Sequence, residues 1–241
     1  MRTGFHYDPL YLEHVAGRGH PECPERLDAT MAHLRQCEWF PGLAPVLAQP
    51  AELEWIHTIH KPSYVDRAKH ACSAGHPYLD VPDVGISAQS FDAARLATGA
   101  CLSMADAVVA GHVDNAFSLS RPPGHHAEND TALGFCLFNN VAIVARYLQR
   151  HHGLNKILIV DWDVHHGNGT QHSFENDPSV MYASLHQYPY YPGTGAAAEN
   201  GIGRGVGATV NCPMAAGADD ADYQRAFTEK LLPTVNAFAP E

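Results

Sequence analysis

Long apolar runs are absent from this 241-residue sequence, and a secretory pattern is absent from its beginning. A membrane-spanning helix needs about 20 consecutive apolar residues. A signal peptide shows a basic stretch, then an apolar stretch, then a cleavage site of small residues. The sequence therefore predicts a cytoplasmic protein without a membrane partner.

Basic residues are scarce, since 15 Lys and Arg stand against 26 Asp and Glu, and the formal net charge is −11. Such a balance argues against direct binding to nucleic acid, which requires a basic surface. It suits a cationic partner, such as a lysine-rich tail or a polyamine, although an acidic balance is common among proteins.

Paired cysteines are also lacking. The six cysteines show none of the short spacings that structural zinc sites use, so reduced thiols are expected. Histidine is abundant by contrast, with 17 residues. Most of these have no polar cluster around them in the sequence and are expected to be ordinary; they include His33, His57, His70 and His112.

The composition supports one substantial core, because 45% of the residues are hydrophobic and no linker, repeat or low-complexity tract interrupts the chain. A single α/β domain over residues 1–241 is therefore expected. Strand patterns alternate with helical ones, which predicts a mainly parallel sheet with helices on both faces. The expected strands are 3–6, 115–119, 157–160, 181–185 and 208–212. The expected helices are 24–36, 52–60, 62–70, 87–110 (with Ser87 as its N-cap), 139–149 and 220–238.

The most informative stretch is 157–169, which reads ILIVDWDVHHGNG. Its first four residues are typical of a strand buried on both faces. Asp161, Asp163 and His165 follow at alternate positions, so their side chains are expected on one side of the chain, at the carboxyl end of the strand where α/β proteins bind ligands. A carboxylate and an imidazole placed in this way suit Zn²⁺ or a similar divalent metal.

A second polar cluster, Arg121–Glu128, reads RPPGHHAE and follows the expected strand 115–119. The prolines stiffen the turn. The adjacent His125 and His126 can act as acid and base near neutral pH. Asp161 is the natural carboxylate to orient one of them.

Together these clusters resemble the histone deacetylase and acetylpolyamine amidohydrolase family, and the resemblance covers nearly the whole chain. The other segments that carry it are HPECPERL at 20–27, GFC at 134–136, SLH at 184–186 and YPGTG at 191–195. The Pro-Pro-Gly form and Asn168 are similar to class II, which holds many bacterial members. The resemblance implies a three-layer arginase/deacetylase-like α/β fold.

The resemblance also implies a zinc-dependent amidohydrolase that removes an acetyl or short acyl group from an amine. Asp163 and His165 would hold Zn²⁺. His126 would be the general base, while His125, paired with Asp161, would act mainly through its charge. Asn168 would orient His126. Acetyl-lysine peptides, acetylpolyamines and similar acylated amines all remain open as substrates, and a homo-oligomeric state is left open.

Further positions follow from the same resemblance. Gly134, Phe135 and Tyr191 would line a narrow apolar tunnel, in which Tyr191 replaces the more usual phenylalanine. Asp83 would lie on its rim, and Arg26 would line an internal channel. A structural K⁺ site would use the backbone carbonyls of Asp161, Asp163, His165 and Leu185 with the Ser184 hydroxyl.

For several of these residues, an ordinary structural or surface role stays open. Asp161 could be purely structural, Asn168 could serve the turn, and Arg26 could be a surface charge. Phe135 and Tyr191 could be core aromatics. Asp83 could simply form a turn.

The family pattern continues beyond what this sequence contains, with a second metal-binding aspartate and a tyrosine that polarises the substrate carbonyl. Both are expected beyond residue 241, so the chain is expected to be part of a longer protein. One alternative is a non-catalytic acyl-lysine or partner-binding relative. Another is a manganese ureohydrolase, against which the His125–His126 pair argues.

Overall fold

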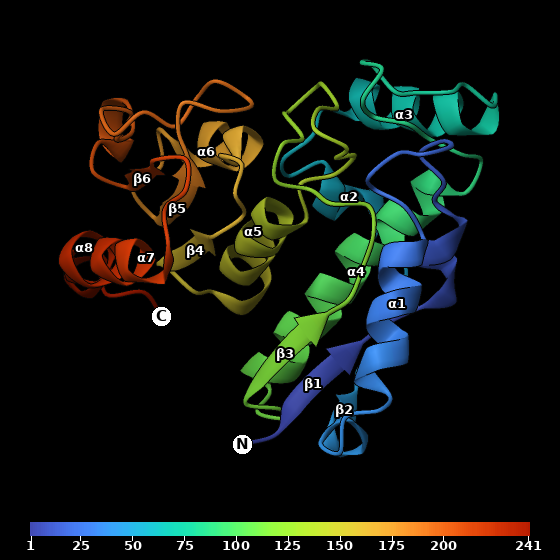
Figure 1. Cartoon of the computed structure of the whole chain (residues 1–241), viewed down its shortest axis with the longest axis horizontal. Helices are drawn as coiled ribbons and strands as arrows, with labels where there is room; N and C mark the ends of the chain where they lie inside the picture. Colours follow the sequence, from blue (N-terminus) through green and yellow to red (C-terminus); the bar gives the residue numbers. More distant parts are fainter. The chain divides into compact units, whose positions relative to one another are not determined.

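The computed structural model describes all residues from 1 to 241 and divides them into two compact units, Met1–Val144 (unit 1) and Ala145–Glu241 (unit 2). Each unit has its own three-stranded parallel sheet with helices packed around it (Figure 1). The α/β class with parallel strands is confirmed. A single catalytic domain over residues 1–241 stays a prediction.

The sheet of unit 1 has β1 (Thr3–His6) in the middle, between β2 (Ala44–Pro45) and β3 (Asn115–Ser118). All of its pairings are parallel. The helices are α1 (Glu25–Leu34), α2 (Leu53–Ile56), α3 (Pro62–Ser73), α4 (Ser90–Val109) and α5 (Asn140–His152), which begins in unit 1 and ends in unit 2; short 3₁₀ turns η1 and η2 cover Pro9–Glu13 and Phe40–Gly42.

Helix α4 packs against β1 and β3 through small side chains. Ala93, Ala97 and Ala100 are fully buried, and a Cβ at Gly99 would overlap the backbone carbonyl of Gln49. Larger side chains at these positions would push the helix away from the segments packed against it, which accounts for the alanine-rich sequence.

The predicted N-cap of this helix is wrong. Helix α4 begins at Ser90, and no side chain caps it. The Ser87 hydroxyl instead donates to the Glu13 carbonyl at 2.7 Å and contacts the Ser90 hydroxyl at 3.0 Å. The Ser87 side chain, which the local sequence pattern assigns to the helix start, therefore makes a tertiary contact instead.

In unit 2, β5 (Val180–Gln187) lies between β4 (Ile157–Asp161) and β6 (Thr209–Met214), again with parallel pairings. The helical elements are α6 (Asn168–Phe174), η3 (Gly203–Gly205), α7 (Asp220–Ala226), a π-helical turn η4 (Phe227–Leu231) and α8 (Leu232–Phe238). The last three form one helical run, whose start is fixed by a capping box between Asp219 and Asp222.

The core of unit 2 lies between the sheet and this helical run. Its buried members are Met181, Ala183, Leu185, Val210, Cys212 and Leu231. The alternation along β4 is clearer than its apolar sequence suggests: Ile157 and Ile159 are buried, whereas Leu158 and Val160 are only partly buried against this core. The prediction that this strand is buried on both faces is therefore only partly correct, because one face is buried and the other is partly buried.

The five predicted strands are present, each within two residues of its expected bounds, whereas β2 and α6 had no sequence signal. None of the helices is both long and apolar enough to cross a membrane.

Candidate active site

The chain leaves β4 as a tightly bonded segment. The Asp163 amide donates to Asp161 Oδ1 at 3.1 Å, and the His165 amide donates to Asp163 Oδ1 at 2.8 Å. Each carboxylate thus accepts from the amide two residues later, which is the local bond that favours aspartate in turns. The Val164 carbonyl accepts from the Gln187 amide at the end of β5, at 2.8 Å. The segment is therefore held both by its own carboxylates and by a hydrogen bond to β5.

Asp163 and His165 present two possible metal ligands at a suitable separation. Asp163 Oδ1 and His165 Nδ1 are hydrogen-bonded to each other at 3.0 Å, and the two side chains are 50% and 34% exposed. Two ligand atoms about 2.0–2.1 Å from one tetrahedral zinc ion lie roughly 3.3 Å apart. The residues therefore fit the zinc pair that the sequence predicts.

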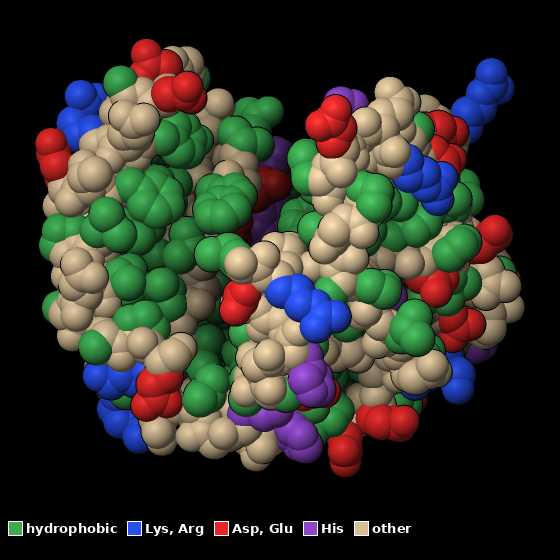
Figure 2. All heavy atoms as spheres, turned by 90° about the horizontal axis from the view of Figure 1, so that it is seen from below, with side chains coloured by type: hydrophobic (Ala, Val, Ile, Leu, Met, Phe, Trp, Pro, Cys, Tyr) green, Lys and Arg blue, Asp and Glu red, His purple; other side chains and the backbone are tan.

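Aromatic side chains flank His165. The Tyr190 ring stacks on its imidazole, with centroids 5.4 Å apart and an interplanar angle of 17°. The Tyr191 ring meets it edge-on, at 5.9 Å and 83°. Trp162 and Val164 on either side of Asp163 are also exposed, at 70% and 44%. Figure 2 shows one face of the molecule, on which hydrophobic side chains (green) reach the surface between polar ones.

Asp161 is held by a tyrosine that sequence reasoning missed. The Tyr182 hydroxyl donates to Asp161 Oδ2 at 3.1 Å and accepts from the Gly167 amide at 3.0 Å. Burial, together with the Asp161 charge, raises the pKa of Tyr182 well above its usual value, so the phenol stays protonated and keeps donating. Its sequence signal is weak: it lies on β5, two residues before Ser184 and therefore on the same face.

A buried polar network lies behind this segment. His166 Nδ1 is 2.7 Å from the Thr194 hydroxyl, and its Nε2 is 2.9 Å from Gln171 Oε1. Gln171 Nε2 in turn donates to Glu199 Oε2 at 2.8 Å. Burial and the neighbouring His186 lower the pKa of His166 to about 4, so this imidazole is neutral near pH 7.

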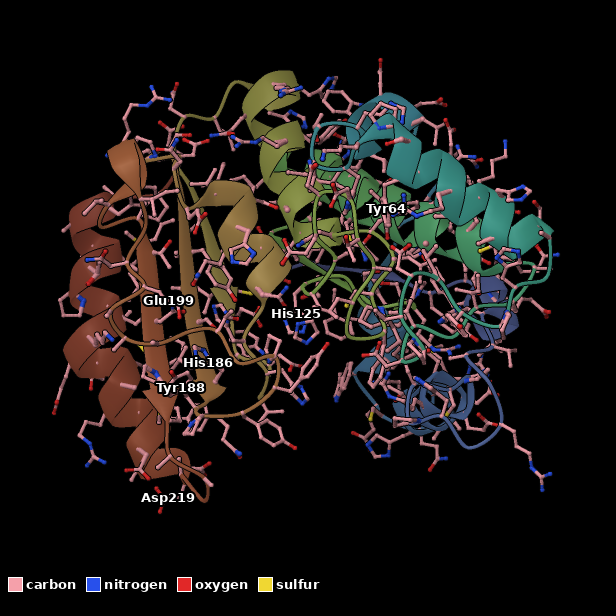
Figure 3. The ribbon with its side chains drawn as sticks, turned by 90° about the horizontal axis from the view of Figure 1, so that it is seen from above. Tyr64, His125, His186, Tyr188, Glu199 and Asp219 are labelled. Atoms are coloured by element: carbon pink, nitrogen blue, oxygen red, sulfur yellow. The ribbon has the colours of Figure 1, made fainter.

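The same network fixes the loop after β5; Figure 3 labels His186, near the end of β5, and Glu199, in the loop. His186 Nε2 donates to the Gly195 carbonyl at 2.9 Å, and the Glu199 carboxylate accepts from the amides of Gly195 and Ala196. Gly195 has φ +93°, and a Cβ there would overlap both His166 and His186. The YPGTG motif needs glycine at this position for that reason.

In unit 1, the His125 and His126 rings lie against each other, with centroids 4.1 Å apart. His126 is buried, and His125 is half-buried. Gly134 has φ +55°, and a Cβ there would overlap the His126 ring. The loop that carries Gly134 and Phe135 therefore packs directly on His126.

The two motifs of unit 1 meet through Glu22 and Arg121. Arg121 Nη2 donates to Glu22 Oε2 at 2.7 Å, and its Nε donates to Oε1. The guanidinium also donates to the carbonyls of Tyr11 and His14, at 2.7 and 2.9 Å. Neither residue had a role in the sequence prediction beyond membership of a motif.

His20 connects two of the predicted substrate-site positions. Its ring meets Phe135 edge-on at 4.6 Å, and its Nε2 donates to the Asp83 carbonyl at 3.2 Å. Phe135 is half-buried and has φ +68°. The Arg26 side chain is 57% exposed and lies 3.5 Å from Glu22 Oε1.

The predicted residues thus fall into two sets. The set in unit 1 is Arg26, Asp83, His125, His126, Gly134 and Phe135; the set in unit 2 is Asp161, Asp163, His165, Asn168, Ser184, Leu185 and Tyr191. Pairings across the two sets stay predictions. Asn168 is buried at the first turn of α6, and β4–β5 pairing places Asp161 opposite Ser184. That register is compatible with the predicted K⁺ site.

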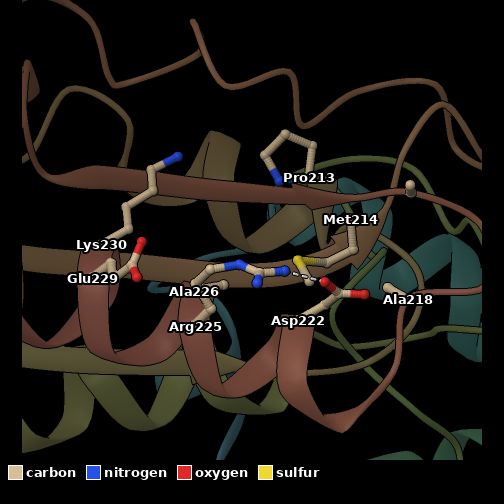
Figure 4. A pocket seen from close by; sticks show the side chains of 9 residues that line it. Pro213, Met214, Ala218, Asp222, Arg225, Ala226, Glu229 and Lys230 are labelled. Atoms are coloured by element: carbon tan, nitrogen blue, oxygen red, sulfur yellow. Dashed lines mark hydrogen bonds and ion pairs between the residues drawn. The ribbon is translucent and has the colours of Figure 1, made fainter.

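A pocket lies elsewhere in unit 2, between the end of β6 and the helical run (Figure 4). It is lined by Pro213, Met214, Ala215, Ala218, Asp222, Arg225, Ala226, Glu229 and Lys230. Arg225 and Asp222, one turn apart on α7, form an ion pair in its wall. None of the predicted site residues lines it.

Comparisons with known proteins bear on the family and the fold. The family model described as "Histone deacetylase domain" matches residues 20–241. A "Probable deacetylase" of Archaeoglobus fulgidus is 41% identical over 100% of this chain and 67% of its own length. "Polyamine deacetylase HDAC10" of Homo sapiens is 42% identical over 92% of this chain and 35% of its own length. The crystal structure of the HDA15 HD domain superposes with a TM-score of 0.94 at 42% identity, covering 99% of this chain and 69% of that one.

The chain is an α/β protein with parallel sheets, of the class that the deacetylase domain fold represents. The chain belongs to the histone deacetylase domain family.

Proposed function

We propose that the chain carries the site of a zinc-dependent deacylase, which hydrolyses the amide bond of an acetylated or otherwise short-acylated amine. The observation that carries the proposal is the 3.0 Å separation of Asp163 Oδ1 and His165 Nδ1 in a member of the deacetylase family. Such a pair would hold Zn²⁺, which polarises an amide carbonyl and acidifies water when it is bound. The third ligand and the carbonyl-polarising tyrosine are expected outside residues 1–241.

In this proposal His126 takes a proton from the attacking water and passes it to the leaving amine. Its burial and its packing against Gly134 support a fixed orientation. His125, paired with Asp161, contributes mainly through its charge. Asn168 orients His126, and because a neutral amide stabilises imidazolium less than a carboxylate does, His126 is the less basic member of the pair.

Phe135 and Tyr191 form the tunnel walls, with Gly134 beside them and Asp83 at the rim. The edge-on contact between His20 and Phe135 supports a wall of fixed orientation. Arg26 lines the internal channel, and K⁺ binds at Asp161, Asp163, His165, Ser184 and Leu185. The substrate is an acetyl-lysine peptide or an acetylated polyamine, in keeping with the acidic balance of the chain, and the protein acts in the cytoplasm.

The test uses the full-length, zinc-loaded protein with a fluorogenic acetyl-lysine peptide and an acetylated polyamine. His126→Ala is expected to lower kcat by about 10²–10⁴, the usual contribution of a general acid–base, and to keep zinc bound. His125→Ala is expected to lower it less. Near-wild-type turnover in His126→Ala would refute the mechanism. Tight binding of acetyl-lysine peptide without turnover by the wild type would favour the non-catalytic alternative.

A further inference from the structure

His60 is a buried histidine for which the proposed mechanism has no use. It lies just before α3 and is 1% exposed. Its Nδ1 is 2.8 Å from the Glu128 carbonyl, and its Nε2 is 2.9 Å from the Asn139 amide. One imidazole therefore bonds to both ends of the loop 128–139, which carries Gly134 and Phe135.

These partners fix the protonation state of the ring. A backbone carbonyl only accepts and a backbone amide only donates, so Nδ1 carries the hydrogen and Nε2 must be bare. Burial lowers the pKa of His60 to about 4, although the backbone at Glu128 and Asn129 and the Glu128 charge oppose this shift. A charged His57 lowers the pKa further. The other titratable group against the ring is Tyr64, whose ring centroid is 5.3 Å away.

Neighbouring hydrogen bonds also connect the segment around His60 to the same loop. The Lys61 amide donates to the Asn129 carbonyl at 2.9 Å, and Asn129 Nδ2 donates to the Ile59 carbonyl at 2.5 Å. The Tyr64 hydroxyl, labelled on α3 in Figure 3, donates to the Leu137 carbonyl at 2.6 Å. His60 is the one member of this set that bonds to both loop ends.

We propose that neutral His60 is a positioning residue for the site: it ties Glu128 to Asn139, so that Gly134 stays packed on His126 and Phe135 keeps its place. Protonation of Nε2 removes the acceptor for the Asn139 amide, so that His60 no longer connects the two ends of the loop. The effect on catalysis rests on the proposed function, whereas the effect on the loop does not.

The first measurement is amide hydrogen exchange in peptides from the loop 128–139 and, as a reference, from α4. His60→Leu removes both bonds at similar volume, and is expected to speed exchange in the loop about tenfold or more while α4 stays protected. His60→Gln keeps one donor and one acceptor and should restore part of the protection. His57→Leu, at an exposed histidine three residues earlier, is the matched control and should leave both regions unchanged.

Unchanged loop exchange in His60→Leu, or faster exchange spread evenly over unit 1, would overturn the proposal. If that variant does not fold, the wild type decides: imidazole ¹⁵N shifts should show His60 as the Nδ1–H tautomer down to about pH 5. A charged ring or the other tautomer at pH 6 would refute the proposed hydrogen bonds of His60 to Glu128 and Asn139.

Kinetics separate positioning from mere folding. His60→Leu with zinc bound should lower kcat for the acetyl-lysine peptide about tenfold, because a small displacement of reacting groups is costly, and His60→Gln should lie closer to the wild type. Wild-type kcat in a variant with a mobile loop would overturn the positioning role. A full-length wild type without any activity would refute the proposed function alone, since loop exchange still tests the hydrogen bonds of His60 to both loop ends.

Discussion

Glu22 and Arg121 form a two-point ion pair inside unit 1, where their side chains are 2% and 1% exposed. The pair joins the HPE motif to the RPPGHH motif, 99 residues apart in the chain. Burial alone would raise the pKa of Glu22, but the close contact with His14 Nε2 at 3.1 Å and the hydrogen bonds from Arg121 outweigh it and lower the pKa to about 2. The carboxylate is therefore charged at any pH at which the protein is expected to work.

Glu22→Gln is expected to destabilise the protein by about 3–5 kcal/mol, because Arg121 would keep a buried charge without its partner. Urea unfolding at pH 7 measures the change. Arg26→Ala is the control: it removes a second partner of Glu22, but one that is 57% exposed and 3.5 Å away, so a loss of about 1 kcal/mol or less is expected. Equal small losses in both variants would show that the buried pair contributes no more than a surface one.

The acid sensitivity of folding should carry a contribution from His60. Its pKa is lowered from 6.5 to about 4 in the folded state, so the unfolded state binds more protons between these values. The contribution is fully present above pH 6.5 and is lost as the pH falls toward 4, with a total of about 3 kcal/mol. Glu22 acts in a separate window, since its stabilisation is lost as the pH falls from 4.5 toward 2.

The measurement is the free energy of unfolding at pH 7 and at pH 4.5 for the wild type and His60→Gln. The variant should lose markedly less stability over this interval, because an amide does not titrate there. His112→Gln, at an exposed histidine that does not contribute to the pKa of His60, should behave like the wild type. An identical pH dependence in all three proteins would contradict the low pKa of His60.

What could be predicted from the sequence has a common physical basis. The strand at 157–161 and the polar residues after it follow from local hydrophobicity and strand alternation, so the positions of Asp163 and His165 were readable. His60 was not readable, because its amide partner Asn139 lies 79 residues away and its neighbours in the sequence are unremarkable. Ser87 is the opposite case: the local sequence predicts an N-cap, but the hydroxyl donates to the Glu13 carbonyl, 74 residues distant.

The glycine at position 134 gives a further test of the dyad loop. Gly134→Ala must adopt a positive φ and must displace the His126 ring, so a loss of stability and a fall in kcat with zinc retained are expected. Gly75→Ala is the matched control, since Gly75 has φ +72° but a Cβ there meets nothing within 4 Å. It should cost only about 1 kcal/mol and leave kcat unchanged. Similar effects of both substitutions on kcat would show that the contact with His126 is unimportant.

The metal prediction is the most direct. Asp163→Ala and His165→Ala should each weaken zinc binding by about 100-fold or more, beyond the 10–100-fold that loss of an outer partner of a ligand costs. His172→Ala, at an exposed histidine on the adjacent helix α6, should keep the wild-type affinity. Metal content after dialysis against a chelator of known affinity gives the comparison. The ligand atoms of Asp163 and His165 lie within 3.0 Å of each other, so an ion bound by one of them must feel the loss of the other. Unchanged zinc content in both variants would mean that the ion, if it binds, lies elsewhere in the protein.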